Sequence, residues 1–382
     1  MTLSGRLFEV PRSTSNLVPP PAAALREHLA PLFEHEDGEA RVVALMEARF
    51  ATFHDVPHCV AHANGFWALV STIRALTQAR EATGRDEIVM PSLTYRRLAD
   101  VAAWAGLKPR FCEVDPASLA ATPATMEACI GPRTALLLPV HPIVGVLDAA
   151  ALEAMARRHG LPILFDAVES VHEVLPEGRI GGFGDAEVFS LHASKLLNGF
   201  EGGYVTTRDA GLAARLSAAR DHGRGPHALN ARLSALHAAA ALAALERVEA
   251  QVRHNRAIHE AYQHHLAGIP GLSLRGFDEA TRPSFKNIVV AVDPQAWPLT
   301  RDATVAALNA EGALARAYYA PPLHRKPMAY AHVPAELPLT DALAGRFMLM
   351  PCGHFMSEAD VAAIAGLLRM LAAGAQSSGI GA

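Results

Sequence analysis

The sequence predicts an α/β fold in three layers, a mostly parallel β-sheet with helices on both faces, joined to a smaller α+β domain. Two observations favour it. The 382 residues are 51% hydrophobic and 19% charged, so the chain has enough apolar material for more than one core. Between residues 58 and 191, short apolar runs of strand length alternate with runs of helical periodicity. Such alternation is typical of parallel sheets buried on both sides.

The elements of the large domain follow in chain order. Apolar residues recur at helical spacing over 22–33 and 39–53, and the acidic stretch 34–38 separates these two helices. A strand at 58–63 then leads through a glycine into a helix at 66–80. Further strands are expected at 87–90, 109–114, 134–140, 161–165 and 186–191, and further helices at 97–104 and 149–159.

The last third of the chain predicts long helices and then a smaller unit. Residues 229–266 have the pattern of one or two long helices. After them we expect a strand at 287–292 and helices at 302–311 and 358–372. The predicted division is a large domain over residues 1–250, including the N-terminal helices, and a small α+β domain over residues 251–382.

Charge and composition exclude several classes of partner. The net charge of −4, from 34 basic and 38 acidic residues, gives no field that would attract nucleic acid or an anionic membrane. Neither a secretory signal nor a membrane span is recognisable. The four cysteines are scattered, and a reducing cytoplasm is the simplest expectation. No metal site is expected, because the histidines form no set with Cys or acids at ligand spacing.

A lysine marks the first candidate site. Lys195 follows the apolar run 186–191 and precedes the glycine-bearing turn 198–203. A lysine beside a buried strand loses solvation and can act as a nucleophile, forming a Schiff base with an aldehyde. The hydroxyls of Ser190 and Ser194 are close enough in sequence to bind an anionic group on the aldehyde's carrier. From this stretch alone, an ordinary solvated lysine is an equal alternative.

Two other strand ends carry candidate groups. Asn64-Gly65 lies between a strand and a helix, where free backbone N–H groups and the helix dipole favour an anion, although many such turns bind nothing. Asp166 directly follows the strand at 161–165. It is either a helix cap or a fixed negative charge facing a cationic ring nitrogen. In parallel sheets, ligands gather at these carboxyl ends.

Together these groups match the needs of pyridoxal phosphate: a lysine for the aldehyde, a helix N-terminus and hydroxyls for the phosphate, a carboxylate for the ring nitrogen and an aromatic for the ring face. The residues concerned are Asn64, Gly65, Tyr95, Asp166, Ser190 and Lys195. At this point the chain resembles the DegT/DnrJ/StrS-type sugar-nucleotide aminotransferases, within the fold type I, aspartate-aminotransferase-like enzymes. The resemblance is carried, in order, by segments 91–95, 140–141, 189–195, 198–203, 318–324 and 349–351.

The resemblance implies a role for each matching residue. Lys195 would be the Schiff-base lysine, Asp166 the partner of the pyridine nitrogen, Tyr95 the ring stack and Ser190 a phosphate ligand. Asn230 would reach the phosphate bound by the partner of a homodimer with shared active sites. Further cofactor contacts are implied for Asn64, Gly65, Phe66, Glu169 and His192. Lys108, Lys286 and Lys326 lie in other segments, and none is expected to replace Lys195.

Three positions depart from the family pattern. Phe66 stands where a threonine hydroxyl is usual, so that phosphate contact would come from backbone amides. Ala228 replaces a glycine two residues before Asn230. Glu169 replaces a glutamine or histidine that approaches the phenolic oxygen of the cofactor. Its carboxylate either raises the pKa of the lysine–cofactor adduct or is itself protonated and donates a hydrogen bond.

The resemblance implies transamination in two halves in the cytoplasm. Glutamate would give its nitrogen to the cofactor, and the pyridoxamine phosphate so formed would aminate a nucleotide-linked keto-deoxysugar, or another keto substrate. Two alternatives stay open: another pyridoxal phosphate reaction, such as elimination, aldol cleavage or condensation on an amino acid, and a non-catalytic cofactor-binding regulatory protein. A nucleotide-dependent dehydrogenase ranks far below these, because no G-x-G-x-x-G follows the first strand.

Overall fold

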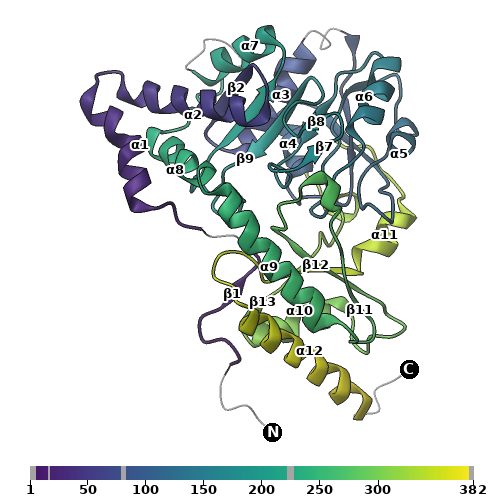
Figure 1. Cartoon of the computed structure of the whole chain (residues 1–382). Helices are drawn as coiled ribbons and strands as arrows, with labels where there is room; N and C mark the ends of the chain where they lie inside the picture. The colour runs from purple at the N-terminus through teal and green to yellow at the C-terminus, as the bar shows by residue number, and fades with distance from the viewer. Residues whose placement is uncertain (1–5, 16–17, 79–82, 222–227, 378–382) are drawn as a thin grey trace.

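A central β-sheet organises the larger part of the computed structural model, which describes residues 6–15, 18–78, 83–221 and 228–377 (Figure 1). Its strands pair in the orders β4-β3-β5 and β2-β10-β9-β6, and isolated parallel bridges join β5 to β6. Only β10 runs antiparallel to its neighbours among the described strands of this sheet, so the prediction of a mostly parallel sheet is confirmed. The strands are β2 His58–His62, β3 Glu87–Pro91, β4 Lys108–Cys112, β5 Thr134–Leu137, β6 Leu164–Asp166, β9 Ala186–Ser190 and β10 Gly203–Thr207.

Each strand supplies side chains to two cores, because successive residues point to opposite faces of a sheet. Along β2, Cys59 and Ala61 enter one core and Val60 enters the other. The first core also receives helices α2 Gly38–His54, α5 Pro123–Glu127, α6 Ala149–Arg158 and α8 Ala235–Leu245. The second receives α3 Gly65–Thr77, α4 Leu98–Trp104 and α7 Ala210–Arg220. Helix α1, Ala22–Glu34, packs on α2 and α8.

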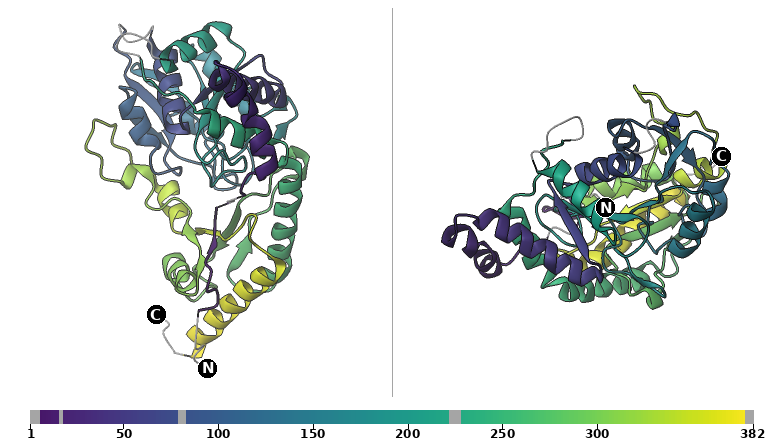
Figure 2. Two further views of the ribbon diagram at one scale, coloured as in Figure 1. Left: turned by 90° about the vertical axis from the view of Figure 1, so that its left-hand side faces the viewer. Right: turned by 90° about the horizontal axis from the view of Figure 1, so that it is seen from above.

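A long helix, α9 (Val248–Leu266), leads from the large sheet into a smaller part with its own core (Figures 1 and 2). That part holds an antiparallel sheet in the order β11-β12-β15-β14. Its elements are β11 Leu272–Leu274, β12 Ile288–Val292, α10 Arg301–Ala310, β13 Ala313–Leu314, β14 Arg316–Ala317, α11 Pro338–Ala344, β15 Phe347–Met350 and α12 Glu358–Ser377.

Short pairings and turns complete the chain. Near the N-terminus, β1 (Arg12–Ser13) pairs in parallel with β13, and Phe8 is buried in the core of the smaller part. The remaining short elements are β7 Val174–Leu175, β8 Gly178–Arg179 and the 3₁₀ turns Glu279–Thr281 and Leu323–Arg325. The division of the chain at residue 250 stays a prediction.

Most expected elements are present, and the differences have local causes. The helical pattern of 229–266 is two helices, because Ser234 caps α8 through the backbone N–H of His237 and the chain turns at Glu246 before α9 begins. Strand β10 was not predicted, since the glycines before it are typical of a turn. Of the predicted helix 66–80, the last two residues lie outside the described residues. None of the described helices is long and apolar enough to cross a membrane.

Candidate active site

Two neighbouring strand ends place an acid and an amine at one edge of the large sheet. Strands β6 and β9 run in parallel, with Asp166 in register with Val188. Strand β9 therefore ends at Ser190, beside the end of β6, and the turn that follows brings Lys195 to the same edge. The carboxyl ends of these two strands therefore bring Asp166, Ser190 and Lys195 to one edge of the sheet.

A cavity opens at this edge. It is lined by Pro91, Leu93, Thr94, Tyr95, Leu119, Val140, His141, Pro142, Ile143, Asp166, Val168, Glu169, Tyr318 and Tyr319. Tyr95 is 49% exposed, an unusual state for an aromatic side chain on a cavity wall. The predicted groups Tyr95, Asp166 and Glu169 thus share one cavity, although 74 residues separate the first from the last in sequence order.

Asp166 has an unusual electrostatic environment. The residue is only 3% exposed, and its Oδ1 accepts one hydrogen bond, from the backbone N–H of Val168, at 3.2 Å. Burial raises the pKa of Asp166 to about 6, although that hydrogen bond and the charge of Lys195 both act to lower it. A cation placed against this carboxyl would return its pKa toward the ordinary range. Of the two sequence alternatives, a partner for a cation fits better than a helix cap, since no helix begins here.

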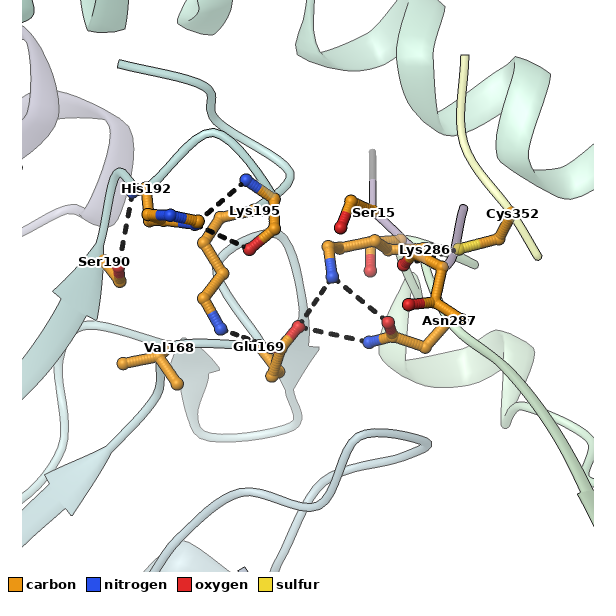
Figure 3. A network of polar contacts seen from close by, with 12 residues as sticks. Ser15, Val168, Glu169, Ser190, His192, Lys195, Lys286, Asn287 and Cys352 are labelled. Carbon is orange, nitrogen blue, oxygen red and sulfur yellow. Dashed lines mark hydrogen bonds and ion pairs between the residues drawn. The ribbon is translucent and has the colours of Figure 1, made fainter. Parts of the chain in front are cut away.

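Glu169 connects two lysines. Its Oε1 contacts Lys195 Nζ, and its Oε2 accepts hydrogen bonds from Lys286 Nζ at 2.9 Å and from Asn287 Nδ2 at 3.1 Å (Figure 3). Burial alone would raise the pKa of Glu169, but the charges of Lys195 and Lys286 outweigh it and hold the pKa well below its usual range. The surroundings therefore favour the ionised form over the protonated alternative.

Lys286, which the sequence places in another segment, also reaches this site, and the prediction that it does not replace Lys195 stays a prediction. Lys286 stands just before β12 in the smaller part of the chain, 91 residues after Lys195, yet both amines reach one carboxylate. The sequence offered one weak signal, a Lys-Asn pair directly before an apolar strand. Nothing in the spacing indicated that this strand end faces the large sheet.

The N-terminus of α3 meets the end of β9. The Asn64 side chain accepts from the backbone N–H of Trp67 at 2.9 Å and so caps the helix. A Cβ atom added at Gly65 would lie 3.1 Å from Ser190 Cβ, so the first residue of α3 packs directly against Ser190. The Phe66 ring packs against Trp67 and under the guanidinium of Arg97. This geometry suits an anion held by backbone amides and a hydroxyl.

Two predicted residues lie at the margin. His192 is exposed, and its Nδ1 is 2.8 Å from Ser194 Oγ while its Nε2 is 3.6 Å from Glu201. Asn230 is exposed with a positive φ of 46°, and within the described residues no hydrogen bond links its side chain to the cavity. One chain therefore brings Tyr95, Asp166, Glu169 and Lys195 together, while His192 and Asn230 lie outside the cavity lining.

One buried histidine at the cavity was given no role by the sequence. Neither ring nitrogen of His141 has a hydrogen-bond partner among the described residues, and its Nε2 lies 3.5 Å from Glu187 Oε1. His141 also lines the cavity, and its electrostatic interaction with Asp166 acts to lower the pKa of that carboxyl. The signal available in the sequence was its place in segment 140–141, which carried the resemblance but no function.

The residues present fit pyridoxal phosphate. The N-terminus of α3 at Gly65 packs against Ser190, so backbone N–H groups and a hydroxyl lie side by side, as a phosphate site requires. Lys195, which contacts Glu169, would supply the amine, and the buried Asp166 would supply a carboxylate for the ring nitrogen. Among the described residues no group of three or more His, Cys, Asp or Glu could hold a metal ion.

The chain is similar to known sugar aminotransferases. The UDP-N-acetyl-3-dehydro-α-D-glucosamine 3-aminotransferase of Acidithiobacillus ferrooxidans is 29% identical over 368 residues, which are 91% of this chain and 97% of that protein. The GDP-perosamine synthase of Caulobacter vibrioides is 30% identical over 336 residues, 84% of this chain and 87% of its own.

A solved structure extends the likeness to the fold. The crystal structure of DesI, determined in the presence of its TDP-sugar product, has a TM-score of 0.88 at 31% identity and covers 98% of this chain and 96% of its own. The DegT/DnrJ/EryC1/StrS aminotransferase family matches residues 38–369. With its site and this match, the chain belongs to the DegT/DnrJ/EryC1/StrS aminotransferase family, whose members are pyridoxal phosphate-dependent enzymes.

Proposed function

We propose that this aminotransferase moves an amino group from glutamate to the keto carbon of a nucleotide-linked sugar, in amino-sugar biosynthesis. The observation that carries the proposal is the meeting of the Lys195 amine and the buried Asp166 carboxyl at one sheet edge. The sugar class is supported by the relatives, whose names refer to UDP-, GDP- and TDP-linked sugars. Because three different nucleotides occur in these names, the relatives support a nucleotide-linked sugar as the class of substrate without favouring a particular nucleotide.

Each residue has a definite task in this proposal. Pyridoxal phosphate supplies an aldehyde and a ring that accepts electrons from the carbon next to the transferred nitrogen. Lys195 Nζ would hold the aldehyde and would move a proton to or from that carbon. Asp166 would keep the proton on the ring nitrogen, while Ser190 and the amides that open α3 would bind the phosphate. Tyr95 would contact the ring.

A homodimer with shared active sites belongs to the same proposal. Tyr95 on the cavity wall and Phe200 in the turn after β9 are 49% and 39% exposed, and a second subunit that covered these rings would remove them from water. Asn230 is exposed and turned into the left-handed region, where it is available to a second subunit. A reducing cytoplasm is also proposed, and the four free cysteines support it.

The test uses the purified protein with its cofactor. Glutamate should remove the visible absorbance of the lysine–cofactor adduct, and TDP-, UDP- and GDP-linked keto sugars should then be tried one by one to restore it. The productive sugar should gain an amine that mass spectrometry detects. Loss of absorbance with no restoration by any keto sugar would contradict the sugar assignment, and no response to amino donors would favour a regulatory protein.

A further inference from the structure

The two oxygens of Glu169 hold lysines from different parts of the fold. Lys195 reaches Oε1 from the turn after β9, and Lys286 reaches Oε2 from the residues before β12 (Figure 3). Asn287 closes the arrangement, because its Nδ2 donates to Glu169 Oε2 at 3.1 Å and its Oδ1 accepts from Lys286 Nζ at 3.1 Å. Lys286 is thereby fixed by two acceptors.

All three charged side chains are withdrawn from water. The side chains of Lys286, Glu169 and Lys195 are 5%, 11% and 19% exposed. In such a setting a charge acts on its neighbours with little solvent screening. One carboxylate faces two ammonium groups. The negative charge that acts on each lysine is therefore partly neutralised by the positive charge of the other.

Other titratable groups face Glu169 as well, from every side of the cavity. Asp166 adds negative charge from β6, while Tyr318 and Tyr319 follow β14 and Cys352 follows β15. Burial raises the pKa of the two tyrosines and of the thiol, so these three groups stay neutral near neutral pH. In the described network, Lys286 is therefore the cation, in addition to Lys195, that neutralises the negative charge of Glu169.

We propose that Lys286 is a positioning residue for Lys195: by sharing Glu169, it offsets the carboxylate charge and lets the Lys195 nitrogen lose its proton at a lower pH. The inference rests on the proposed function, since a neutral amine is the form of Lys195 that attacks an aldehyde. Without Lys286, the full charge of Glu169 would act on Lys195 and hold its proton. Capture of the aldehyde near neutral pH would then be slower.

A set of variants tests this without any keto sugar. Acetic anhydride is added to the cofactor-free protein at a series of pH values, and mass spectrometry gives the pH midpoint of acetylation at Lys195. A second readout is the pH profile of the rate at which pyridoxal phosphate is captured. We expect Lys286→Met to raise both midpoints by about one pH unit, which is about a tenfold slower capture at pH 7. Lys286→Arg should keep both midpoints, because it preserves the charge.

The partner of the pair should act in the opposite direction. Glu169→Gln removes the carboxylate charge that favours the protonated form of Lys195, while the positive charge of Lys286 stays. The acetylation midpoint of Lys195 should therefore fall, and the visible band of the adduct should titrate at lower pH. The double variant Glu169→Gln/Lys286→Met replaces the pair by neutral side chains of similar size and should return the midpoint toward that of the unaltered chain. It also remains informative if Lys286→Met alone does not fold.

A control and the contrary outcomes complete the test. Lys326 lies on the surface, where its Nζ donates to the backbone oxygen of Arg96, and Lys326→Met should leave Lys195 unchanged. The inference is overturned if Lys286→Met leaves the Lys195 midpoint in place, or if the two single variants shift it in the same direction. Neither outcome depends on the sugar substrate, so a failed search for that substrate is a separate result.

Discussion

Lys195 and Lys286, which are 91 residues apart in the chain, contact the two oxygens of a single carboxylate, that of Glu169. Lys195 lies in the turn that follows β9 of the large sheet, and Lys286 lies just before β12 of the smaller one. The position of the smaller part on the large sheet therefore determines the charge around the amine. This relationship makes the identity of the reactive lysine a question for experiment.

Lys195→Ala should abolish the visible adduct with pyridoxal phosphate. Lys195 lies in the turn directly after β9, at the proposed cofactor site, whereas Lys286 comes from the smaller part and is held by Glu169 and Asn287. Borohydride reduction and peptide mapping of the unaltered protein should place the label on Lys195. Lys326→Ala serves as the surface control. A reducible band in Lys195→Ala, with the label on Lys286, would show that the assignment of the amine is wrong.

Asp166→Asn should remove a pH-dependent cost of folding. The pKa of Asp166 is raised to about 6, so between about pH 4 and pH 6 the folded protein keeps a proton that the unfolded chain has released, and stability falls as pH rises through this window. In urea titrations without cofactor, the gain of Asp166→Asn in unfolding free energy should be larger at pH 8 than at pH 5, by about 1 kcal/mol.

The same variant should bind pyridoxal phosphate more weakly, because an amide offers no negative charge to the ring nitrogen. Equal gains in stability at the two pH values would mean that the carboxyl of Asp166 titrates normally.

Gly65→Ala should weaken binding of the cofactor. The new Cβ would lie 3.1 Å from Ser190 Cβ and 3.5 Å from Ser190 Oγ, so it would displace the hydroxyl that is proposed to bind the phosphate. A loss of about tenfold in affinity is expected, equivalent to about 1.4 kcal/mol. The matched control is Gly366→Ala in α12, where an added Cβ would have no neighbour within 4 Å. Fluorescence titration with pyridoxal phosphate measures the affinity of both variants. Equal affinities would show that the phosphate does not bind at the N-terminus of α3.

A mixture of two impaired variants should recover activity if the active sites are shared. Lys195→Ala and Asn230→Ala are unfolded together and refolded, so that mixed dimers pair an intact Lys195 with an intact Asn230 from the other subunit. Up to about a quarter of the unaltered activity is expected for random dimers. Light scattering should show at least a dimer. A monomer with full activity, or a mixture no better than its components, would contradict the shared site.

The sequence by itself determined the elements and most of the site. Strands that end at Asp166 and Ser190 must present these residues at one edge once they lie in parallel, since parallel neighbours share their carboxyl ends. The positions of the lysine in the following turn and of the glycine that opens α3 also follow from this local order of strand, turn and helix. These are consequences of short-range pattern, which periodicity and turn residues report well.

Only the tertiary structure decided which distant charges meet. Strand β12 packs in a separate antiparallel sheet, and the residues before it approach Glu169 because of how the two parts of the chain are joined through α9. No local pattern encodes that approach. The state of Glu169 follows from it, since a buried carboxylate alone would tend to be protonated, and two ammonium groups keep it ionised. For the same reason the sequence left two alternatives for Glu169, and the fold selects one.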